Sequence, residues 1–312
     1  MKQYLLIDIG GTFIKYSLTD AYAKKISGGK VPTPLTGMDN LLAVIEDFSA
    51  PWKGQFEGCA VSMPGRIDTN RGIAHTGGIL SAFMWEQPFA SMLEQSLGVP
   101  VVIANDGKCA AAAEAWTGSL AGVDNGLVLV LGTGIGGGII LNGRVYMGSH
   151  SAAGEVSNLV TELGSMEGDD FRFEVIGKVA ESPVWAGKAS ASGLIAAYAA
   201  VPAHAPQPTG EEIFAAHAAG EPEACRALKK FARRVALGII SLQSVLDVER
   251  VAIGGGISAA DALLPAIQTE LDDLFARCPV FPMLEPELVR CRYGNDANMI
   301  GALKLFFEQK PV

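Results

Sequence analysis

Short apolar runs alternate with amphipathic stretches along the first part of the chain. The apolar runs have the length and composition of buried β-strands and lie at Tyr4–Ile9, Ile14–Leu18, Gly58–Met63 and Val99–Ala104. Apolar residues at helical spacing predict helices at Leu41–Phe48, Phe89–Leu97 and Lys108–Thr117. This alternation predicts an α/β fold, in which functional residues gather at the carboxyl ends of the strands.

The same pattern returns in the second part of the chain. Strands are expected at Gly126–Leu131, Gly137–Leu141 and Val251–Ile253, and helices at Ser190–Ala200, Glu211–Ala219, Glu223–Leu246 and from near Ala260. A chain of 312 residues is long enough for two domains. We predict a small domain of residues 1–117 plus 298–312, to which the apolar helix Ala297–Phe307 returns, and a larger domain of residues 118–297.

Two glycine-rich turns of the same kind interrupt apolar strands, one in each half. The first consists of Gly10, Gly11 and Thr12, and the second of Gly132, Thr133 and Gly134. Glycines in such a turn expose consecutive backbone N–H groups with no Cβ in the way, so an anion can bind against them. A single turn of this kind is often only a tight hairpin. Two matched turns indicate a nucleotide held from both sides, and hence phosphoryl transfer.

Composition and charge exclude several classes of protein. Hydrophobic residues make up 49% of the chain and charged residues 18%, which excludes disorder. A strand follows Met1 almost at once, with neither a signal peptide nor a membrane-spanning run, so we expect a cytoplasmic protein without membrane partners.

The net charge of −9 and the pI near 5.0 argue against a nucleic-acid partner. One cluster of basic residues (Lys229, Lys230, Arg233 and Arg234) is typical of a solvated helix face. The five cysteines are scattered and odd in number, which predicts reduced thiols.

Four motifs together carry a family resemblance. They are Asp8-x-Gly10-Gly11-Thr12-x-x-Lys15, Asn105-Asp106, the segment Leu131–Gly138 and Gly254-Gly255-Gly256-Ile257. Their order and spacing resemble the ROK family of sugar kinases across nearly the whole chain. The resemblance implies duplicated actin-like, hexokinase-like (ribonuclease H-like) ATPase domains around a central cleft. It also implies ATP and Mg²⁺ as cofactors, a small-molecule sugar substrate and a homodimer.

Two further comparisons refine this resemblance. Gly294-Asn295-Asp296-Ala297 and the short chain look most like the β-glucoside kinases of the family. The family also includes transcriptional repressors with an additional N-terminal helix-turn-helix domain. Because the first phosphate turn begins only a few residues after Met1, we expect no such domain here.

One segment departs from the family pattern. Many members carry Gly-Glu-Ile-Gly-His followed by a cysteine-rich zinc loop, but this chain has Gly154-Glu155-Val156-Ser157-Asn158. Asn158 therefore replaces a metal-binding histidine, and no cysteine lies between Cys109 and Cys225. Since zinc needs about four nitrogen or sulfur ligands, structural zinc is predicted to be absent. The stretch Leu159–Asp170 must then be braced in another way.

The resemblance assigns roles around the sugar. Asp106 is the expected catalytic base, because a carboxylate can take the proton of the attacking sugar hydroxyl. Its alternative role is to cap the following helix. Asn105, Glu155 and Asn158 are expected to hold sugar hydroxyls, and the alternative for Glu155 is a solvated loop glutamate. Gly65 and Gly78 lie where the family builds its sugar pocket, or they simply form turns.

The resemblance also assigns roles around the nucleotide. Gly10, Gly11 and Thr12 are expected to meet the γ-phosphate, and Gly132, Thr133 and Gly134 the other phosphates, with Gly254, Gly255 and Gly256 against the adenosine. Asp8 is the expected partner of hydrated Mg²⁺, with turn formation as its alternative. Lys15 is expected either to approach the phosphates or to leave an exposed strand.

These assignments lead to one prediction and its alternatives. We expect an ATP-dependent kinase that phosphorylates the 6-hydroxyl of a hexose or β-glucoside. The segment Gly77–Trp85, with Phe83, Met84 and Trp85, offers a surface that can stack on a second sugar or an aglycone. The alternatives are a kinase for N-acetylmannosamine, glucose or fructose, a non-catalytic sugar sensor, and a filament-forming or chaperone-like ATPase of the same superfamily.

Overall fold

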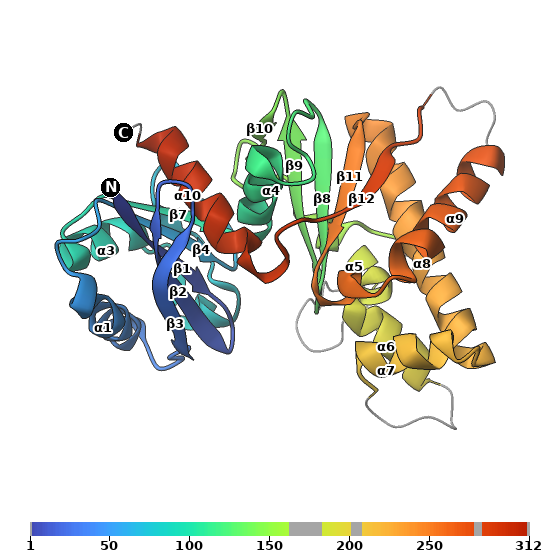
Figure 1. Cartoon of the computed structure of the whole chain (residues 1–312), viewed down its shortest axis with the longest axis horizontal. Coiled ribbons are helices and arrows are strands. Elements are labelled where there is room, and N and C mark those ends of the chain that lie inside the picture. The colour runs from blue at the N-terminus through green and yellow to red at the C-terminus, as the bar shows by residue number, and fades with distance from the viewer. Residues whose placement is uncertain (1, 162–182, 201–207, 278–282, 311–312) are drawn as a thin grey trace, which may run out of the picture. The chain divides into compact units, whose positions relative to one another are not determined.

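The structure, a computed structural model, describes residues 2–161, 183–200, 208–277 and 283–310 (Figure 1). The chain forms two compact units. Unit one comprises Met1–Gly118, Arg144–Ala153 and Asp296–Val312, and unit two comprises Ser119–Gly143 and Gly154–Asn295. The division expected from the sequence assigned all of 118–297 to the second domain, whereas the segment Arg144–Ala153 clusters with unit one, where Val145 and Met147 pack against its core.

The sheet of unit one has the strand order β3-β2-β1-β4-β7. Its strands are β1 (Gln3–Ile9), β2 (Phe13–Asp20), β3 (Lys25–Pro32), β4 (Cys59–Met63) and β7 (Val101–Asn105). β1, β2 and β3 form an antiparallel meander, while β4 lies parallel to β1 and β7 parallel to β4. The carboxyl ends of β1, β4 and β7 therefore meet at one edge of the sheet.

Helices cover both faces of this sheet. On one face lie α1 (Met38–Ser49), α2 (Ser81–Met84) and α3 (Phe89–Leu97), and on the other α4 (Asp106–Thr117) and α10 (Ala297–Gln309). α10 runs along α4, and a Cβ on Gly301 would lie 1.6 Å from the carbonyl oxygen of Cys109, so only glycine allows this approach (Figure 1). The C-terminal helix α10 belongs to unit one, where Met299, Leu303 and Phe306 share a core with its sheet.

Unit one also contains short elements in its loops. They are a single helical turn at Ala50–Trp52, β5 (Ile67–Asp68), β6 (Ile73–Ala74) and a turn at Gly78–Leu80. The short strand β10 (Arg144–Val145) is the edge strand of the second sheet, next to β9 (Ile135–Leu141). β5 and β6 pair with each other in antiparallel fashion, at the base of the loops that follow β4.

Unit two repeats the plan of unit one. β8 (Gly126–Leu131) and β9 (Ile135–Leu141) form an antiparallel hairpin, β11 (Arg250–Gly254) lies parallel to β8, and β12 (Glu287–Arg290) lies parallel to β11. In both units, a hairpin with a glycine-rich turn is followed by parallel strands. The predicted duplicated α/β fold is confirmed.

The helices of unit two enclose one large apolar core. They are α5 (Trp185–Ala189), α6 (Ala191–Ala199), α7 (Gly210–Ala218), α8 (Pro222–Leu246) and α9 (Leu263–Arg277), with helical turns at Val156–Asn158, Gly256–Ala259 and Gly294–Asp296. α8 packs against α5, α6, α7 and α9. Within the described ranges, none of the helices combines the length and the apolar character needed to cross a bilayer.

The sequence analysis missed the edge strands β3 and β12 and the two-residue strands β5, β6 and β10, and it misplaced the starts of several helices, α4 and α9 among them. β3 and β12 are edge strands, largely exposed and rich in charged or glycine residues, so neither shows the apolar run of a buried strand. α4 begins at Asp106 instead of Lys108, because Asn105 caps it. The helix expected near Ala260 is a turn at Gly256–Ala259 followed by α9 from Leu263.

Candidate active site

Three strand ends bring the predicted site residues of unit one to the same edge of its sheet. β1 leads into the turn at Gly10, β4 into Pro64 and Gly65, and β7 into Asp106 through its last residue, Asn105. Asp8 is aligned with Ser62 in β4, and Met63 is aligned with Asn105 in β7. The ends of three strands that are far apart in the sequence thus lie along one edge of the sheet, with β4 between β1 and β7.

The first glycine turn is braced by its own hairpin and by Thr33. The Gly10 N–H donates to the Phe13 carbonyl at 3.0 Å, and the Thr33 hydroxyl donates to the Gly10 carbonyl at 2.7 Å. The Thr33 N–H also donates to the Thr12 carbonyl at 3.0 Å. Thr33 follows the edge strand β3, which the sequence did not predict, so its bracing role had no detectable signal.

Gly11 is exposed at the tip of this turn, and the fold does not require a glycine there. A Cβ at Gly11 would meet only the side chain of Ile79, at an ordinary contact distance of 3.6 Å, and its φ lies outside the left-handed region. The absence of a side chain leaves the backbone open to a ligand.

Asp8 lies beneath the turn, with 7% of its surface exposed. Its Oδ1 accepts a hydrogen bond from Nδ2 of Asn298 at 3.1 Å, and its Oδ2 lies 3.8 Å from Nζ of Lys15. Burial raises the pKa of Asp8, which the hydrogen bond from Asn298 and the positive charge of Lys15 oppose. The sequence did not single out Asn298, because its position on the returning helix α10 is visible only in the fold.

This donor set fits a hydrated magnesium ion. Mg²⁺ usually keeps several waters and takes one or two carboxylates together with substrate phosphates. Asp8 supplies one carboxylate next to an open glycine turn, and a nearby cation would favour its charged form. A cage made wholly of protein ligands is not needed.

Asn105 and Asp106 divide two roles between them. Oδ1 of Asn105 accepts from the Lys108 N–H at 3.2 Å, and its Nδ2 donates to the Gly65 carbonyl at 2.9 Å. Asn105 is therefore the helix cap that the sequence offered as the alternative role of Asp106. Asp106 is the first residue of α4, and its Oδ1 accepts from the Gly107 N–H at 2.8 Å.

The carboxylates of Asp106 and Asp8 both affect the pKa of the Cys109 thiol. Burial raises the pKa of Cys109 well above its ordinary value, and the negative charges of Asp106 and Asp8 raise it further. A carboxylate from β1 and one from the first residue of α4 thus act on the same thiol. The electrostatic character of unit one's edge is acidic, with Lys15 as the cation that faces Asp8.

Gly65 and Gly78 are demanded by the packing of their own loops. Gly65 has φ +102°, and a Cβ there would lie 2.5 Å from the carbonyl oxygen of Thr76. Gly78 has φ +57°, and a Cβ there would lie 3.0 Å from Pro64. Their turn role is thus established, and it holds the Gly65 carbonyl where Asn105 reaches it.

The second glycine turn, in unit two, is braced in a different way. The Gly132 N–H donates to the Gly134 carbonyl at 3.0 Å, and the Gly132 carbonyl accepts from the Ala191 N–H at 2.9 Å. The Ser157 hydroxyl contacts both the N–H and the carbonyl of Ile135, at 3.0 and 2.8 Å. A Cβ at Gly132 would meet no atom within 4 Å, so this glycine too is not required by packing.

A pocket of about 810 Å³ opens beside this turn. Its walls come from the turn, from α6, from α7 and from the helical turn after β11, through Leu131, Gly132, Thr133, Ala191, Ser192, Ile195, Thr209, Gly210, Glu211, Phe214, Gly256, Ile257, Ala259 and Ala260. α6 and α7 both begin here, with Ser190 and Thr209 as their caps. Two helix N-termini favour negative charge, and half-buried apolar residues such as Phe214 suit a flat ring.

The three glycines after β11 are not equivalent. Gly255 has φ +92°, and a Cβ there would lie 2.2 Å from the carbonyl oxygen of Leu131, while a Cβ at Gly254 would lie 3.0 Å from Sγ of Cys291. Gly256 has open space around it and lines the pocket. The structure therefore brings Gly132, Thr133 and Gly256 into one pocket, and gives Gly254 and Gly255 packing roles.

Glu155 and Asn158 lie on an exposed helical turn of unit two. The turn is anchored by the buried side chain of Val156 and by the hydrogen bonds between the Ser157 hydroxyl and the backbone of Ile135 in the β8–β9 hairpin. Gly154, before it, has φ +84° and packs against the backbone of β9. Glu155 is thus presented on the surface of unit two by a turn that is tied directly to the second glycine turn.

The metal prediction can be compared only with the described residues. Among these, there is no group of three or more histidine, cysteine, aspartate and glutamate side chains that could hold a metal ion. Most of the stretch in which the family places its zinc loop, residues 162–182, lies outside the described residues, as does Cys278. Cys59, Cys109 and Cys225 are free thiols.

Comparisons with known proteins agree with this arrangement. The profile of the ROK family matches residues 4–309. The chain is 30% identical to the β-glucoside kinase of Listeria innocua, over 97% of both chains, and 27% identical to the N-acetyl-D-glucosamine kinase of Yersinia pseudotuberculosis, over 98% of this chain and all of that enzyme. It is also 30% identical to the bifunctional enzyme NanE/NanK of Brucella melitensis, of which it spans only 53%.

Solved structures give the same result. The ROK hexokinase of Thermus thermophilus has a TM-score of 0.80 at 26% identity, covering 99% of this chain and 100% of that one. A ROK glucokinase of Streptomyces griseus, solved with glucose and AMPPNP, has a TM-score of 0.75 at 25% identity, covering 97% and 98%. The predicted actin-like fold and the predicted ROK carbohydrate kinase family are confirmed: the chain belongs to the ROK family.

Proposed function

We propose that the protein is an ATP- and Mg²⁺-dependent sugar kinase that phosphorylates the 6-hydroxyl of a hexose or β-glucoside. The observation that carries this proposal is the edge of unit one. There Asn105 supplies the helix cap, so that Asp106 is not needed as the cap and stands at the first position of α4. The same edge of the sheet carries the buried Asp8 and the open glycine turn, at the end of β1. As the resemblance implies, the enzyme would act in the cytoplasm as a homodimer.

Asp106 would act as the general base. Its carboxylate takes the proton of the sugar hydroxyl as the hydroxyl oxygen attacks the γ-phosphorus, and the bond from that phosphorus to the β–γ bridging oxygen breaks to release ADP. The N-terminus of α4 stabilises the charged carboxylate, because the helix dipole favours negative charge there. Asn105 fixes the start of the helix through Lys108 and holds the Gly65 carbonyl beside it.

The two glycine turns would hold the phosphates. Gly10, Gly11 and Thr12 suit the γ-phosphate, since Gly11 has no side chain although packing would tolerate one. Gly132, Thr133 and Gly134 suit the remaining phosphates next to two helix N-termini. Asp8 would hold Mg²⁺ through water, with Lys15 beside it, and the bound ion would neutralise phosphate charge.

The adenosine would occupy the pocket of unit two. Its volume of about 810 Å³ and its apolar wall at Ile195, Phe214 and Ile257 suit an aromatic base and a ribose. Gly256 lines it with open space, which supports close approach of a ligand to the backbone. The relative from Streptomyces griseus was solved with AMPPNP, which supports a nucleotide here as well.

The substrate would be a β-glucoside or a related hexose. Glu155 and Asn158 would bind its hydroxyls, from the turn that Ser157 fixes. Of the segment proposed to stack on an aglycone, Met84 is fully buried, but Trp85 is 61% exposed and Ile79 60% exposed. Ile79 also lies beside Gly11, so this segment borders the turn proposed for the γ-phosphate.

The first experiment measures ADP release with Mg-ATP against glucose, mannose, fructose, N-acetylmannosamine, cellobiose and gentiobiose. We expect turnover that depends on the sugar and that Asp106→Asn abolishes. ADP release that is independent of any sugar would support a different ATPase of the same fold. Sugar binding without ADP release would support a sensor, and either result would overturn the proposal.

The substrate class has its own test. Trp85→Ala should raise KM for cellobiose and gentiobiose several-fold and leave KM for glucose nearly unchanged, because glucose has no second ring to stack on the indole. Tyr22→Ala removes an even more exposed aromatic residue of unit one and serves as the control. Turnover on glucose but never on a disaccharide would contradict the β-glucoside assignment.

A further inference from the structure

Unit two carries a second pocket, of about 400 Å³, that the proposed kinase reaction does not use. It lies between α5, α6 and α8. Among the described residues, the charged side chains that line it are Lys188, Glu223, Arg226, Lys230 and Arg234, four cations and one carboxylate in a chain whose net charge is −9. Such a concentration of positive charge creates a local field opposite to that of the whole protein.

The walls of this basic pocket are held firmly. Trp185 of α5 is 1% exposed, and its indole Nε1–H donates to the backbone carbonyl of Arg234 at 2.9 Å. A Cβ on Gly238 of α8 would lie 2.1 Å from the indole ring, so α5 is seated closely on α8. Lys188 follows Trp185 by three residues, and its backbone is therefore fixed relative to Arg234.

The floor of the pocket is made of small residues of α6. Gly193, Ala196, Ala197 and Ala200 line it, and they leave room for a ligand that larger side chains would fill. Three of the four cations form a single row on α8, because Arg226, Lys230 and Arg234 follow one another at intervals of four residues, and the fourth, Lys188, comes from α5. Their head groups can thus converge on one anion.

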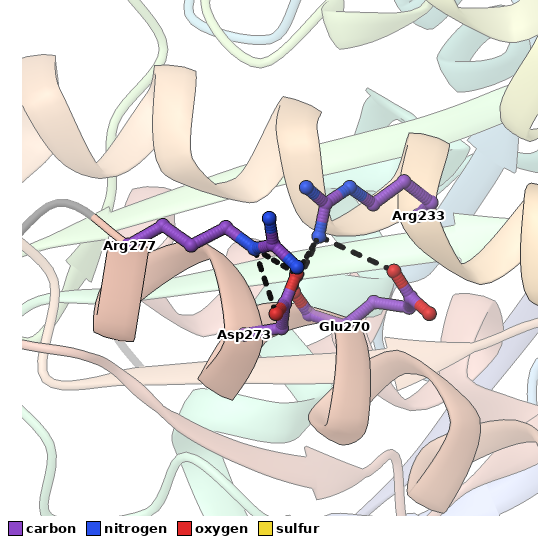
Figure 2. A network of polar contacts seen from close by, with 4 residues as sticks. All are labelled: Arg233, Glu270, Asp273 and Arg277. Carbon is purple, nitrogen blue, oxygen red and sulfur yellow. Dashed lines mark hydrogen bonds and ion pairs between the residues drawn. The ribbon is translucent and has the colours of Figure 1, made fainter.

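On the other side of this row, a groove between α8 and α9 contains charged side chains that neutralise one another. There Arg233 bonds Asp273 at 2.6 Å and Glu270 at 3.3 Å, and Arg277 bonds Asp273 at 2.8 Å (Figure 2). The hydrogen bonds from Arg277 and Arg233 lower the pKa of Asp273. Two arginines and two carboxylates of α8 and α9 therefore compensate one another.

The positive charges of the basic pocket are neutralised less completely by nearby carboxylates. Arg226 forms an ion pair with Glu223, three residues before it. Lys230 and Arg234 form no ion pair with any acidic residue in the part of the chain that the structure describes. Two cations at the edge of a small-floored pocket thus remain available to an external anion.

We propose that this basic pocket binds a small phosphate-bearing metabolite. A phosphate group offers several acceptor oxygens to lysine and arginine donors, and charge-assisted hydrogen bonds of this kind are about twice as strong as neutral ones. The volume lies within the range of about 300–1,000 Å³ typical of ligand pockets. The remainder of the metabolite would lie on the small residues of α6.

The position of the pocket gives it a possible regulatory effect. Ala191, Ser192 and Ile195 of α6 line the proposed nucleotide pocket, whereas Gly193, Ala196 and Ala197 of the same helix line the basic pocket. A ligand that orders α6 from one side would change the nucleotide affinity on the other side. Binding in the basic pocket is the proposal, and it does not depend on kinase activity.

The experiment uses the full chain saturated with Mg-AMPPNP and titrated calorimetrically with glucose 6-phosphate, with inorganic phosphate and with glucose. We expect both phosphates to bind at a site that charge reversal at Lys230 and Arg234 weakens, whereas glucose, which carries no phosphate, should bind only at the proposed active site and equally well in that double variant. The double variant Lys230→Glu/Arg234→Glu should weaken phosphate binding about tenfold or more, since each lost charge-assisted bond contributes more than 1 kcal/mol. Ala200→Leu, which fills the exposed rim without a change of charge, should also weaken it.

Lys229→Glu is the matched control. Lys229 is exposed on the same helix and lines only the groove toward α9, so its reversal changes the field but not the pocket. Its phosphate affinity should stay within about twofold of wild type, because only screened long-range interactions are lost. Tighter binding of glucose 6-phosphate than of inorganic phosphate would identify a phosphorylated metabolite as the ligand, and equal binding would identify the free ion.

Two results would overturn the proposal. One is the absence of calorimetric binding for both phosphates. The other is an equal loss in Lys229→Glu and in the double variant, which would reveal only a general electrostatic attraction. Failure of AMPPNP to bind would contradict the proposed kinase function instead, and the titrations with phosphate would remain interpretable without it.

Discussion

The two glycine turns are alike in sequence, yet their surroundings differ. The turn of unit one, Gly10–Thr12, lies above the buried Asp8 and near Asp106, and its neighbours are linked by charged and polar contacts. The turn of unit two, Gly132–Gly134, opens into a pocket with an apolar wall and two helix N-termini. The two units therefore share a glycine-rich turn between two strands, but the side chains around that turn differ.

This difference assigns separate tasks to the units. Carboxylates next to an anion-binding turn suit proton transfer and the positioning of a metal ion, whereas an apolar pocket suits a base and a ribose. We therefore expect substitutions at the edge of unit one to affect mainly turnover. Substitutions at the pocket of unit two should affect mainly nucleotide affinity.

The largest expected effect is that of Asp106→Asn. Loss of a general base lowers kcat by about 10²–10⁴-fold, and the near-isosteric amide should leave the KM values for sugar and ATP within a few-fold. Steady-state kinetics with the preferred sugar measures both. Asp47→Asn, at an exposed position of α1 in the same unit, is the control and should behave as wild type.

If Asp106→Asn retained the kcat of wild type, Asp106 would not be the general base, and proton transfer would not be assigned to unit one. A raised KM for sugar with unchanged kcat would turn Asp106 into a binding residue. Either result would break the division of tasks between the two units.

The next predictions compare glycines proposed to contact phosphate with glycines that are required only by packing. Gly132→Ala adds a Cβ where no protein atom lies within 4 Å, so the melting temperature should not change. The methyl group would occupy space expected for phosphate, and we expect the Kd for ATP to rise about tenfold, equivalent to about 1.4 kcal/mol. Calorimetry and thermal unfolding measure the two quantities.

Gly255→Ala is the opposite case. Gly255 has a φ of +92°, and an added Cβ would lie 2.2 Å from the carbonyl oxygen of Leu131. We therefore expect Gly255→Ala to lower the free energy of unfolding by about 1–3 kcal/mol. Gly11→Ala in unit one should resemble Gly132→Ala in stability, but should lower kcat more than the affinity for ATP. Equal effects of Gly11→Ala and Gly132→Ala on both constants would mean that the two turns share one task.

Most of the fold was predictable because its buried elements have strong periodic patterns. The central strands β1, β4, β7 and β8 are continuous apolar runs, and α8 shows helical spacing over its whole length. β3 and β12 could not be predicted in this way, since edge strands bury little and their sequences need not be apolar. The order of the strands follows from the family resemblance more than from any local pattern.

The site was predictable where backbone motifs define it, and less so where side chains meet across the fold. Gly11 and Gly132 were identified from their turns, but nothing in the sequence separates them from Gly255, whose role depends on a carbonyl more than 100 positions away. Asn298 and Thr33 reach the first turn from α10 and from the end of β3. Such partners depend on tertiary geometry and leave no local signal.

A smaller effect is expected for Asn298→Ala. It removes the hydrogen bond to Asp8, so the carboxylate loses its fixed orientation, and the Mg²⁺ concentration needed for half-maximal activity should rise several-fold. The free energy of unfolding should fall by about 0.5–1.5 kcal/mol. Gln309→Ala on the same helix removes an exposed bond to Asn70 and is the control. An unchanged Mg²⁺ requirement with lowered stability would leave Asn298 a purely structural residue.

The smallest effect concerns the thiols, and it requires no substitution. Cys59 and Cys109 of unit one are fully buried, and burial raises the pKa of both, whereas Cys225 and Cys291 of unit two are half-buried. With a thiol reagent at pH 8, peptide mass spectrometry should therefore find Cys225 and Cys291 modified first.

The pH dependence of this protection has a definite sign. Because the folded pKa of the buried thiols lies above the unfolded value of about 8.5, they stay protonated in the folded state while the unfolded chain ionises. Their contribution to stability is complete below that pH and is lost as the pH rises, so labelling of Cys59 and Cys109 should accelerate in alkali more than thiolate formation in a free thiol predicts. If Cys109 were modified as fast as Cys225 at pH 8, the edge of unit one that carries Asp106 would open readily, and the contrast between the buried thiols of unit one and the half-buried Cys225 of unit two would not hold in solution.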